Sequence, residues 1–231
     1  MSTQPLRPEV GQTRDALGLK PLTEEVATEE AETTKYLKML FVGVPVIGQV
    51  LAWFVYFCFG KLVKQQHLYD KKFSFLQENQ LGYIYLSVWL LCMTRARLVV
   101  NANGARAPAR VDRPDQHVYK VMDTSGALKD AAYVMMADTG PQGRFNRAQR
   151  GVFNTDESLP LTLVMVLLVG AVFGPVVVGI VLLIGYGRIT FGLKYKESCD
   201  ARGAGFLPAM IGEKLLEGLT LLCAIKGIFA F

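Results

Sequence analysis

Three side chains in the second half of the chain combine two charges and an amide at helical spacing. Arg150, Asn154 and Glu157 follow one another at intervals of four and three residues, so a helix would present them on one face. A guanidinium pairs with a carboxylate, a carboxylate with an ammonium group, and an amide bonds a peptide group. Together they suit a zwitterionic ligand with carboxylates and an amine. The simpler alternative is an Arg150–Glu157 ion pair that only holds helices together.

A second set of polar residues recurs at intervals of seven. Arg188 and Tyr195 would share one face of a helix, and Arg202 would follow the end of that helix. An arginine held beside a thiol favours the thiolate form, which is the nucleophile. The alternative for Arg202 is a loop arginine that contacts lipid headgroups.

The composition predicts that these residues belong to a membrane protein. The chain has 231 residues, of which 51% are hydrophobic and 19% charged, with mean hydropathy +0.27; soluble domains contain about 25% charged residues. Asp, Glu, Lys and Arg are absent from Ser158 to Gly187 and from Met39 to Gly60. An apolar run of about 20 residues is typical of a transmembrane helix. This pattern argues against a soluble enzyme, a disordered chain and a disulfide-stapled secreted domain.

The long charge-free block predicts two antiparallel helices rather than one. Ser158–Gly187 exceeds the length that a single span needs, and Gly174-Pro175 marks a helix stop and restart. Each half must extend through polar residues, back to Arg150 and forward to Tyr195. The two polar sets would therefore meet at the same membrane face.

The other apolar runs bring the expected number of spans to five. They are Met39–Gly60, Asn79–Val100 and a last helix over Gly205–Phe231. The last helix carries three ionisable residues that we expect to pair with one another or between helices, the lysine as partner of the carboxylates: Glu213, Lys214 and Glu217.

The chain divides into three segments. Residues 1–34 form an acidic tail that we expect to be disordered, residues 35–78 an extra N-terminal membrane helix with a basic linker, and residues 79–231 a four-helix membrane domain. The tail, the arginine-rich loop 105–143 and the loop 196–203 would share one face, which the positive-inside rule assigns to the cytosol. The basic cluster Lys61–Lys72 argues for the opposite orientation.

The charge and the sulfur and imidazole groups limit the remaining classes of function. The net charge is +5 with a pI near 9.0, and the basic residues lie beside apolar runs, so we expect membrane contact and no nucleic acid. The two histidines and four cysteines lack metal-ligand spacing. We therefore expect no metal site, and cysteines that act as small buried hydrophobes.

One motif resembles a known family. Phe145–Pro160, FNRAQRGVFNTDESLP, is similar to the signature of the membrane-associated proteins in eicosanoid and glutathione metabolism (MAPEG), nearest to their microsomal glutathione transferase type-three group. The shared pattern is FN-x-x-Q-R, then N-T-x-E and a proline. Supporting likeness lies in Asn101–Pro114 and in Gly187-Arg188 followed by Tyr195. The resemblance covers Asn79–Phe231, and Phe191 stands where the family has a tyrosine.

The resemblance implies an all-α membrane four-helix bundle of the MAPEG type, here with an additional N-terminal transmembrane helix. It also implies a homotrimer with glutathione bound between neighbouring protomers near the cytosolic face. The glutathione-binding residues would be Arg106, Arg150, Asn154, Glu157 and Tyr195. Arg202 would be catalytic, because it matches the arginine that activates the glutathione thiol.

The activity implied is that of a transferase or peroxidase. Glutathione would be conjugated to hydrophobic or lipid-derived electrophiles, or would reduce lipid hydroperoxides, in the endoplasmic reticulum or another organellar membrane. This would be a role in detoxification and lipid metabolism. The alternatives are a non-catalytic scaffold or accessory subunit of a membrane complex, which the extra helix and longer loop favour, and a lipid-binding adaptor. A fold alone does not decide among them.

Overall fold

A computed structural model of the chain describes residues 26–111, 115–120 and 135–229. These residues are almost entirely helical, with one two-residue antiparallel β-ladder, so the prediction of an all-α fold is confirmed. The elements in chain order are α1 (Val26–Phe54), the π-helical turn η1 (Val55–Phe59), α2 (Gly60–Leu62), α3 (Gln66–Glu78), α4 (Gly82–Gly104), α5 (Arg106–Ala109), β1 (Tyr119–Lys120), β2 (Met135–Met136), α6 (Gly140–Gly170), α7 (Gly174–Glu197), the 3₁₀ turn η2 (Asp200–Arg202) and α8 (Gly203–Ile228).

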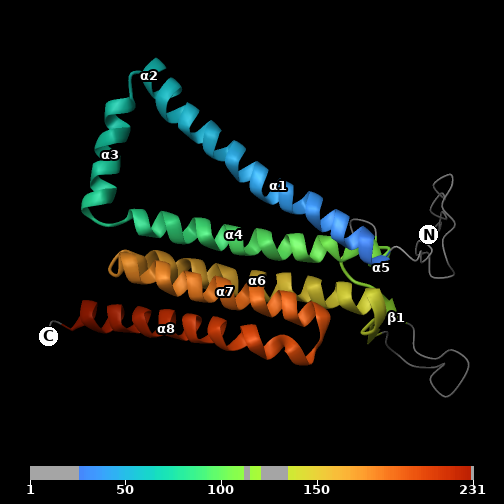
Figure 1. Cartoon of the computed structure of the whole chain (residues 1–231). Coiled ribbons are helices and arrows are strands. Elements are labelled where there is room, and N and C mark those ends of the chain that lie inside the picture. Colours follow the sequence, from blue (N-terminus) through green and yellow to red (C-terminus); the bar gives the residue numbers. More distant parts are fainter. Residues whose placement is uncertain (1–25, 112–114, 121–134, 230–231) are drawn as a thin grey trace, which may run out of the picture.

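Helices α4, α6, α7 and α8 run side by side and form a bundle (Figure 1). Their central core is aliphatic and consists of Leu91, Met165, Val166, Val169, Val177, Ile180, Val181, Ile184 and Leu216. A second core joins α4 and α5 to the start of α6 through small residues packed around Phe145. The cysteines do not belong to these cores: Cys58, Cys92 and Cys199 are exposed and Cys223 is half-buried. None of the four is fully buried, so the expectation of buried cysteines was wrong.

The charge-free block forms two helices, as its Gly-Pro pair predicts. Helix α6 ends at Gly170, and α7 begins at Gly174 with Pro175 in its first turn, where a proline costs no hydrogen bond. Both helices extend farther into the polar sequence than expected, α6 back to Gly140 and α7 on to Glu197. The two polar sets therefore lie on continuous helices at the same end of the bundle.

Helices α7 and α8 approach each other closely at glycines. A Cβ on Gly187 would lie 2.8 Å from Cα of Ala209, and one on Gly205 would lie 2.6 Å from Cα of Phe191. Real side chains do not reach such distances, so only glycine permits this spacing. Small residues at the contact are typical of membrane helices, which associate through close packing.

The N-terminal segment differs from its prediction. Helix α1 begins at Val26, so residues 26–34, expected in the disordered tail, are helical; the rest of the predicted tail lies outside the described residues. The carboxylate of Glu30 explains the extension, because it pairs with Arg144 and Lys196 of the bundle. Acidic residues also stabilise a helix N-terminus. The basic linker is helical too, over Gln66–Glu78.

Helix α1 meets the bundle with its first turns, beside α5 and the end of α4, and then diverges from α4 (Figure 1). Helix α3 returns the chain to the start of α4. The apolar stretch of α1 has none of its residues buried within the chain. Such a surface needs another apolar medium or partner to cover it.

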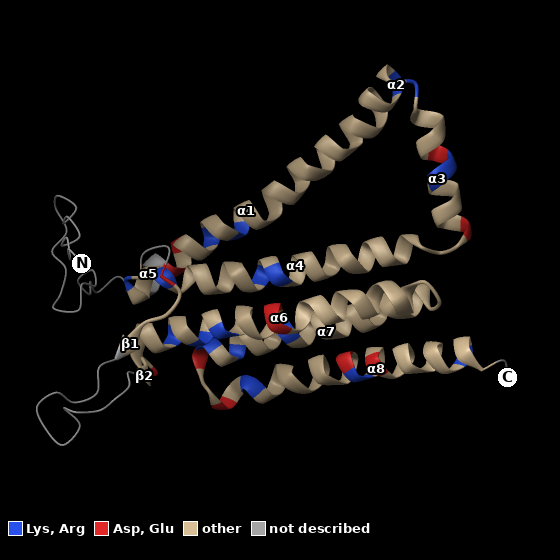
Figure 2. Cartoon of the chain, turned by 180° about the vertical axis from the view of Figure 1, so that it is seen from behind, with Lys and Arg blue, Asp and Glu red and all other residues tan. Residues whose placement is uncertain are grey.

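Four helical stretches are long and apolar enough to cross a membrane: Glu30–Leu62, Gly82–Ala109, Gly140–Gly170 and Gly174–Glu197. The expected extra N-terminal span is among them. Helix α8 is not, although it runs alongside α7 (Figure 1). Lysines and arginines gather at the bundle end that holds α5 and β1, and the α6–α7 turn at the opposite end carries no charge (Figure 2).

Candidate functional site

A cavity of about 820 Å³ lies where α6, α7 and α8 meet. Its wall is polar along α6 and the η2 turn, and α8 adds an apolar part at Phe206, Ala209 and Met210 and a charged part at Glu213 and Lys214. The lining residues are Asn154, Glu157, Arg188, Phe191, Arg202, Gly203, Phe206, Ala209, Met210, Glu213 and Lys214. This volume falls within the usual range of small-molecule sites, about 300–1,000 Å³.

Three of the six predicted site residues line this cavity. Asn154 and Glu157 come from one face of α6, and Arg202 comes from η2. Among the described residues, Arg202 has no hydrogen-bond or ion-pair partner. It is therefore a cation that a bound anionic group could pair with.

Arg150 adjoins the cavity through Glu157. Its Nη1 donates to Oε1 of Glu157 at 2.9 Å, and both side chains are about half exposed. The alternative to a ligand-binding role was that the Arg150–Glu157 pair only holds two helices together. Both residues lie on α6, so the pair joins no helices, and an exposed pair stabilises by about 0–1 kcal/mol. A ligand could exchange with either partner at little cost.

Arg188 forms the floor of the cavity and holds three helices together. Its guanidinium donates to Glu213 of α8, to Oγ of Ser158 at 2.9 Å and to the carbonyl of Asn154 at 3.3 Å. The side chains of Arg188 and Glu213 are only 17% and 21% exposed. Of the two expected kinds of pairing on α8, Lys214 contacts Glu217 on its own helix at 2.8 Å, whereas Glu213 pairs between helices. A charge buried in a bundle must find a partner inside it, and only Glu213 faces inward.

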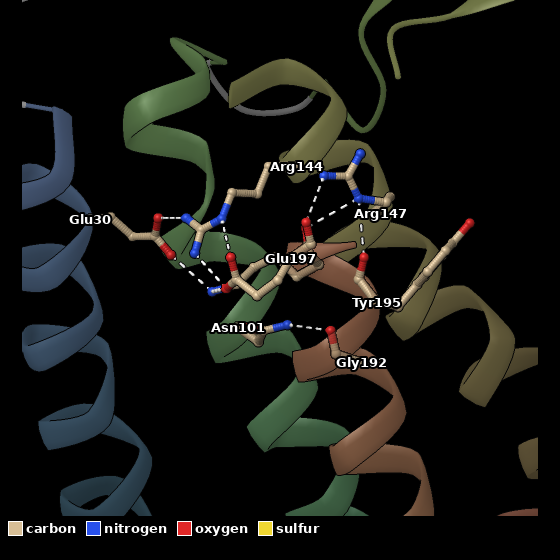
Figure 3. A network of polar contacts seen from close by, with 8 residues as sticks. Glu30, Asn101, Arg144, Arg147, Gly192, Tyr195 and Glu197 are labelled. Atoms are coloured by element: carbon tan, nitrogen blue, oxygen red, sulfur yellow. Dashed lines mark hydrogen bonds and ion pairs between the residues drawn. The ribbon is translucent and has the colours of Figure 1, made fainter. Parts of the chain in front are cut away.

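Tyr195 lies one turn beyond the cavity wall on α7. Its ring packs on Phe191, with 5.3 Å between the centroids, and Phe191 lines the cavity. Its carbonyl oxygen accepts a hydrogen bond from Arg147 at 3.1 Å, while its ring points away from that arginine (Figure 3). Tyr195 is therefore next to the cavity but does not line it.

Arg106 lies outside the cavity, on α5. Its guanidinium sits 5.0 Å from the ring centroid of Phe145 and donates to Oδ1 of Asn103 at 3.1 Å and to the carbonyl of Asp115 at 2.6 Å. Within one chain it is not brought together with Asn154, Glu157 and Arg202. Its proposed contact with glutathione would need a neighbouring protomer.

One residue of the signature motif has a structural role that the sequence did not reveal. The amide of Asn146 donates to the carbonyls of Val118 and Ala137, both at 2.8 Å, and accepts from the amide nitrogen of Val118 at 2.9 Å. Val118 precedes β1 and Ala137 follows β2, so Asn146 holds the outer ends of both strands to α6. Its hydrogen-bonding groups are occupied in this role, so Asn154 is the better ligand candidate of the two motif asparagines.

A polar network on the other side of α7 also went unpredicted (Figure 3). Arg144 pairs with Glu30 of α1 and, at 2.6 Å, with Glu197 of α7; Lys196 reaches Glu30 at 2.9 Å. Arg147 donates to the carbonyls of the last turn of α7. Three helices are joined here at the basic end of the bundle. Glu30 was the residue that could have indicated this network. Its sequence context placed it in a disordered tail, so no partner was sought for it in the bundle.

Fold and cavity together define an all-helical protein that has, among its described residues, four stretches long and apolar enough to cross a membrane and a cavity with polar and apolar walls. Comparison with known proteins adds no narrower class: no protein-family model matches the chain, and no curated protein matches it. The likeness carried by the Phe145–Pro160 motif therefore stays a prediction.

Proposed function

We propose that this protein is a membrane-embedded glutathione transferase that also acts as a glutathione peroxidase. The cavity carries this proposal, because it combines Asn154, Glu157 and the cation of Arg202 with an apolar wall. The motif likeness to the MAPEG family supports the same ligand. In this proposal glutathione is a cosubstrate, and no metal takes part.

The polar wall suits the groups that glutathione carries. A carboxylate of glutathione matches the guanidinium group of Arg150, its ammonium group matches Glu157, and its peptide groups match the amide of Asn154. Arg202 would stabilise the thiolate and so activate the nucleophile. Tyr195 would complete the binding site from its position behind Phe191. In a homotrimer, Arg106 would join from the neighbouring protomer.

The apolar wall suits the second substrate. Phe206, Met210 and Ala209 of α8 line it, and an electrophile dissolved in the bilayer could approach along these side chains. In conjugation, the thiol loses its proton and the thiolate sulfur bonds to the electrophilic carbon; a π bond of the electrophile opens and takes up a proton, or a leaving group departs with its bonding pair. In peroxide reduction, two glutathione molecules form one disulfide while the hydroperoxide becomes an alcohol and water. An endoplasmic reticulum or other organellar membrane would supply both substrates.

The test compares Arg202→Ala with wild type on cumene hydroperoxide and glutathione in detergent. We expect kcat to fall about a hundredfold, the loss typical of removing one charge-stabilising donor, with partial rescue by Arg202→Lys. Lys194→Gln is the matched control, because Lys194 is an exposed cation outside the cavity. Equal rates for wild type and Arg202→Ala would remove the role of Arg202.

Glutathione affinity tests the binding residues separately from the chemistry. Titration calorimetry should show weaker binding for Arg150→Ala and for Glu157→Gln, by about tenfold in each variant, as expected when one charged hydrogen bond is removed. The Lys194→Gln variant should bind as wild type does. If Arg150→Ala and Glu157→Gln both bind glutathione as tightly as wild type does, glutathione does not occupy this cavity.

A second candidate function is a non-catalytic scaffold or accessory subunit of a membrane complex. The observation that favours it is α1, whose apolar stretch has no residue buried within the chain and which diverges from the bundle (Figure 1). Copurification with a stoichiometric partner, together with no measurable glutathione binding, would favour this candidate. Glutathione turnover by the isolated protein would exclude it.

A further inference from the structure

A second cavity, of about 880 Å³, lies on the opposite side of α7 between α1, α4, α6 and α7. It is separate from the cavity assigned to glutathione and shares no lining residue with it. Its lining contains four cations from four helices and a single carboxylate: Lys38 of α1, Arg97 of α4, Arg144 of α6, Lys196 of α7 and Glu30 of α1. The first turn of α6 adds Pro141, so a helix N-terminus also faces this space.

Arg97 has a donor that nothing in the described chain satisfies. Its Nη1 atom is buried and makes no hydrogen bond among the described residues. Leaving a buried charged donor unpaired is costly, and native proteins rarely do so without reason. An acceptor that enters the cavity would satisfy it.

Glu30 occupies part of the cavity as an internal anion. It bridges Arg144 and Lys196, and its side chain is 14% exposed. Glu197 lies outside the cavity lining and contacts Arg144 from the other side. Glu30 and Glu197 therefore both pair with Arg144 and Lys196, while Lys38 and Arg97 have no ion-pair partner among the described residues.

We propose that this cavity binds a phosphate group, with Arg97 and Lys38 as its first ligands and Glu30 as the internal anion that competes for the others. A phosphate offers several oxygens to guanidinium forks and ammonium groups that point at it from different directions, which one carboxylate cannot match. The two sources of such a group are a phospholipid headgroup and free phosphate.

The neighbouring surface favours a phospholipid headgroup. An adjoining groove along α1 shares Ala31 and Lys38 with the cavity and continues over Met39, Val42 and Gly43. This groove enters the apolar part of α1, where a membrane-spanning stretch begins. A headgroup in the cavity would leave its acyl chains along these side chains. Basic pockets between membrane helices bind anionic headgroups in this manner.

The test measures lipid binding to the full-length protein in detergent by native mass spectrometry. Phosphatidylglycerol and phosphatidylcholine with the same acyl chains are the two probes. We expect wild type to prefer phosphatidylglycerol, and Arg97→Gln to weaken that binding about tenfold, as expected for one charged hydrogen bond. Arg95→Gln is the matched control, because Arg95 lies two residues away and pairs with Asp156 outside the cavity.

Glu30→Gln gives a change in the opposite direction. It removes the one carboxylate that lines the cavity without removing a cation, and leaves Arg144 and Lys196 with Glu197 as their remaining partner, so phosphatidylglycerol binding should tighten. If millimolar inorganic phosphate displaces the lipid, free phosphate is a ligand as well; if it does not, the headgroup is recognised with its chains. Excess glutathione should leave lipid binding unchanged, which separates this cavity from the other one.

Equal phosphatidylglycerol affinity in wild type and Arg97→Gln would overturn the proposal. So would a loss of binding in Arg95→Gln as large as in Arg97→Gln, because it would indicate attraction by surface charge alone. Neither result would bear on glutathione turnover, which depends on the residues on the other side of α7.

Discussion

Arg188 carries a positive charge into the bundle, and Glu213 neutralises it from the next helix. The pair joins α7 to α8, and further hydrogen bonds to Ser158 and Asn154 join α6. A charge pair in a low-dielectric surrounding is costly to break, because the remaining charge stays buried without a partner. At the residue scale, this contact holds in place the walls of the cavity that we propose binds glutathione.

We predict that Glu213→Ala destabilises the protein far more than the loss of an exposed pair does. It leaves Arg188 buried and unpaired, which costs about 3 kcal/mol, and the apparent Tm in detergent should fall markedly. Lys214→Ala is the control, since it breaks the exposed pair with Glu217, which is worth about 0–1 kcal/mol. The double variant Arg188→Met/Glu213→Leu should recover most of the loss. Similar Tm values for Glu213→Ala and Lys214→Ala would contradict a buried role.

The candidate site was predictable from the sequence where its residues share one helix. Arg150, Asn154 and Glu157 follow helical spacing, and α6 does present them together. Contacts between helices were not predictable in the same way. The sequence left open whether Glu213 pairs with Lys214 or between helices, because the choice of Arg188 depends on which face of α8 turns inward.

At the scale of elements, the contact between α7 and α8 determines where Arg202 stands. Arg202 lies in η2, directly before α8, and Gly205 begins the close contact with α7 three residues later. The two helices can approach only because Gly187 and Gly205 lack side chains. Any atom added there must push α8, and with it the η2 turn, away from α7.

We predict that Gly205→Ala lowers stability and weakens glutathione binding together. The new Cβ would lie 2.6 Å from Cα of Phe191, and overpacking of this kind costs about 1–3 kcal/mol. Gly218→Ala on the same helix is the matched control, because nothing lies within 4 Å of its added Cβ. That change should be neutral or stabilising by up to about 1 kcal/mol, since alanine favours helix. If the two variants have equal Tm values and equal glutathione affinities, α8 accommodates the added Cβ without cost and the prediction is wrong.

The boundaries of elements were harder to predict than their existence. The Gly174-Pro175 break marks the α6–α7 turn, because glycine and proline act locally. The start of α1 was placed too late because Glu30 reads as part of an acidic tail. Its helix is stabilised by Arg144 and Lys196, more than a hundred residues away, and such distant partners leave no pattern in the local sequence.

At the scale of the whole molecule, the number of spans decides which segments share a membrane face. Four stretches are long and apolar enough to cross, including the additional one at Glu30–Leu62. The fifth expected span, α8, carries Glu213, Lys214 and Glu217, which lowers its hydropathy. Glu213 is neutralised by Arg188 inside the bundle, so the cost of placing α8 in a bilayer is smaller than its composition indicates.

Five spans predict an arrangement that impermeant thiol reagents can test in sealed vesicles. Cys199, exposed between α7 and η2, would lie on one face. Cysteines introduced at Ser74 of α3 and at Lys226 near the end of α8 would lie on the other. Cys199 is kept as the single cysteine in a background where Cys58, Cys92 and Cys223 are alanine, and each introduced cysteine is made where all four native cysteines are alanine. By the positive-inside rule the Cys199 face is cytosolic, because lysines and arginines gather at that end (Figure 2).

The two introduced cysteines test two spans independently: Ser74→Cys reports on α4 and Lys226→Cys reports on α8. Labelling of Ser74→Cys from the same side as Cys199 would show that α4 enters from that side, which contradicts the arrangement as a whole. Labelling of Lys226→Cys from the Cys199 side would show that α8 does not cross the bilayer. In that case the apolar wall of the glutathione cavity would lie at the membrane surface, and water-soluble electrophiles should then be turned over as fast as lipid hydroperoxides. We expect instead that both introduced cysteines are labelled from the side opposite to Cys199. We also expect a clear preference for bilayer-dissolved substrates, because the apolar wall belongs to α8, which would then lie within the bilayer.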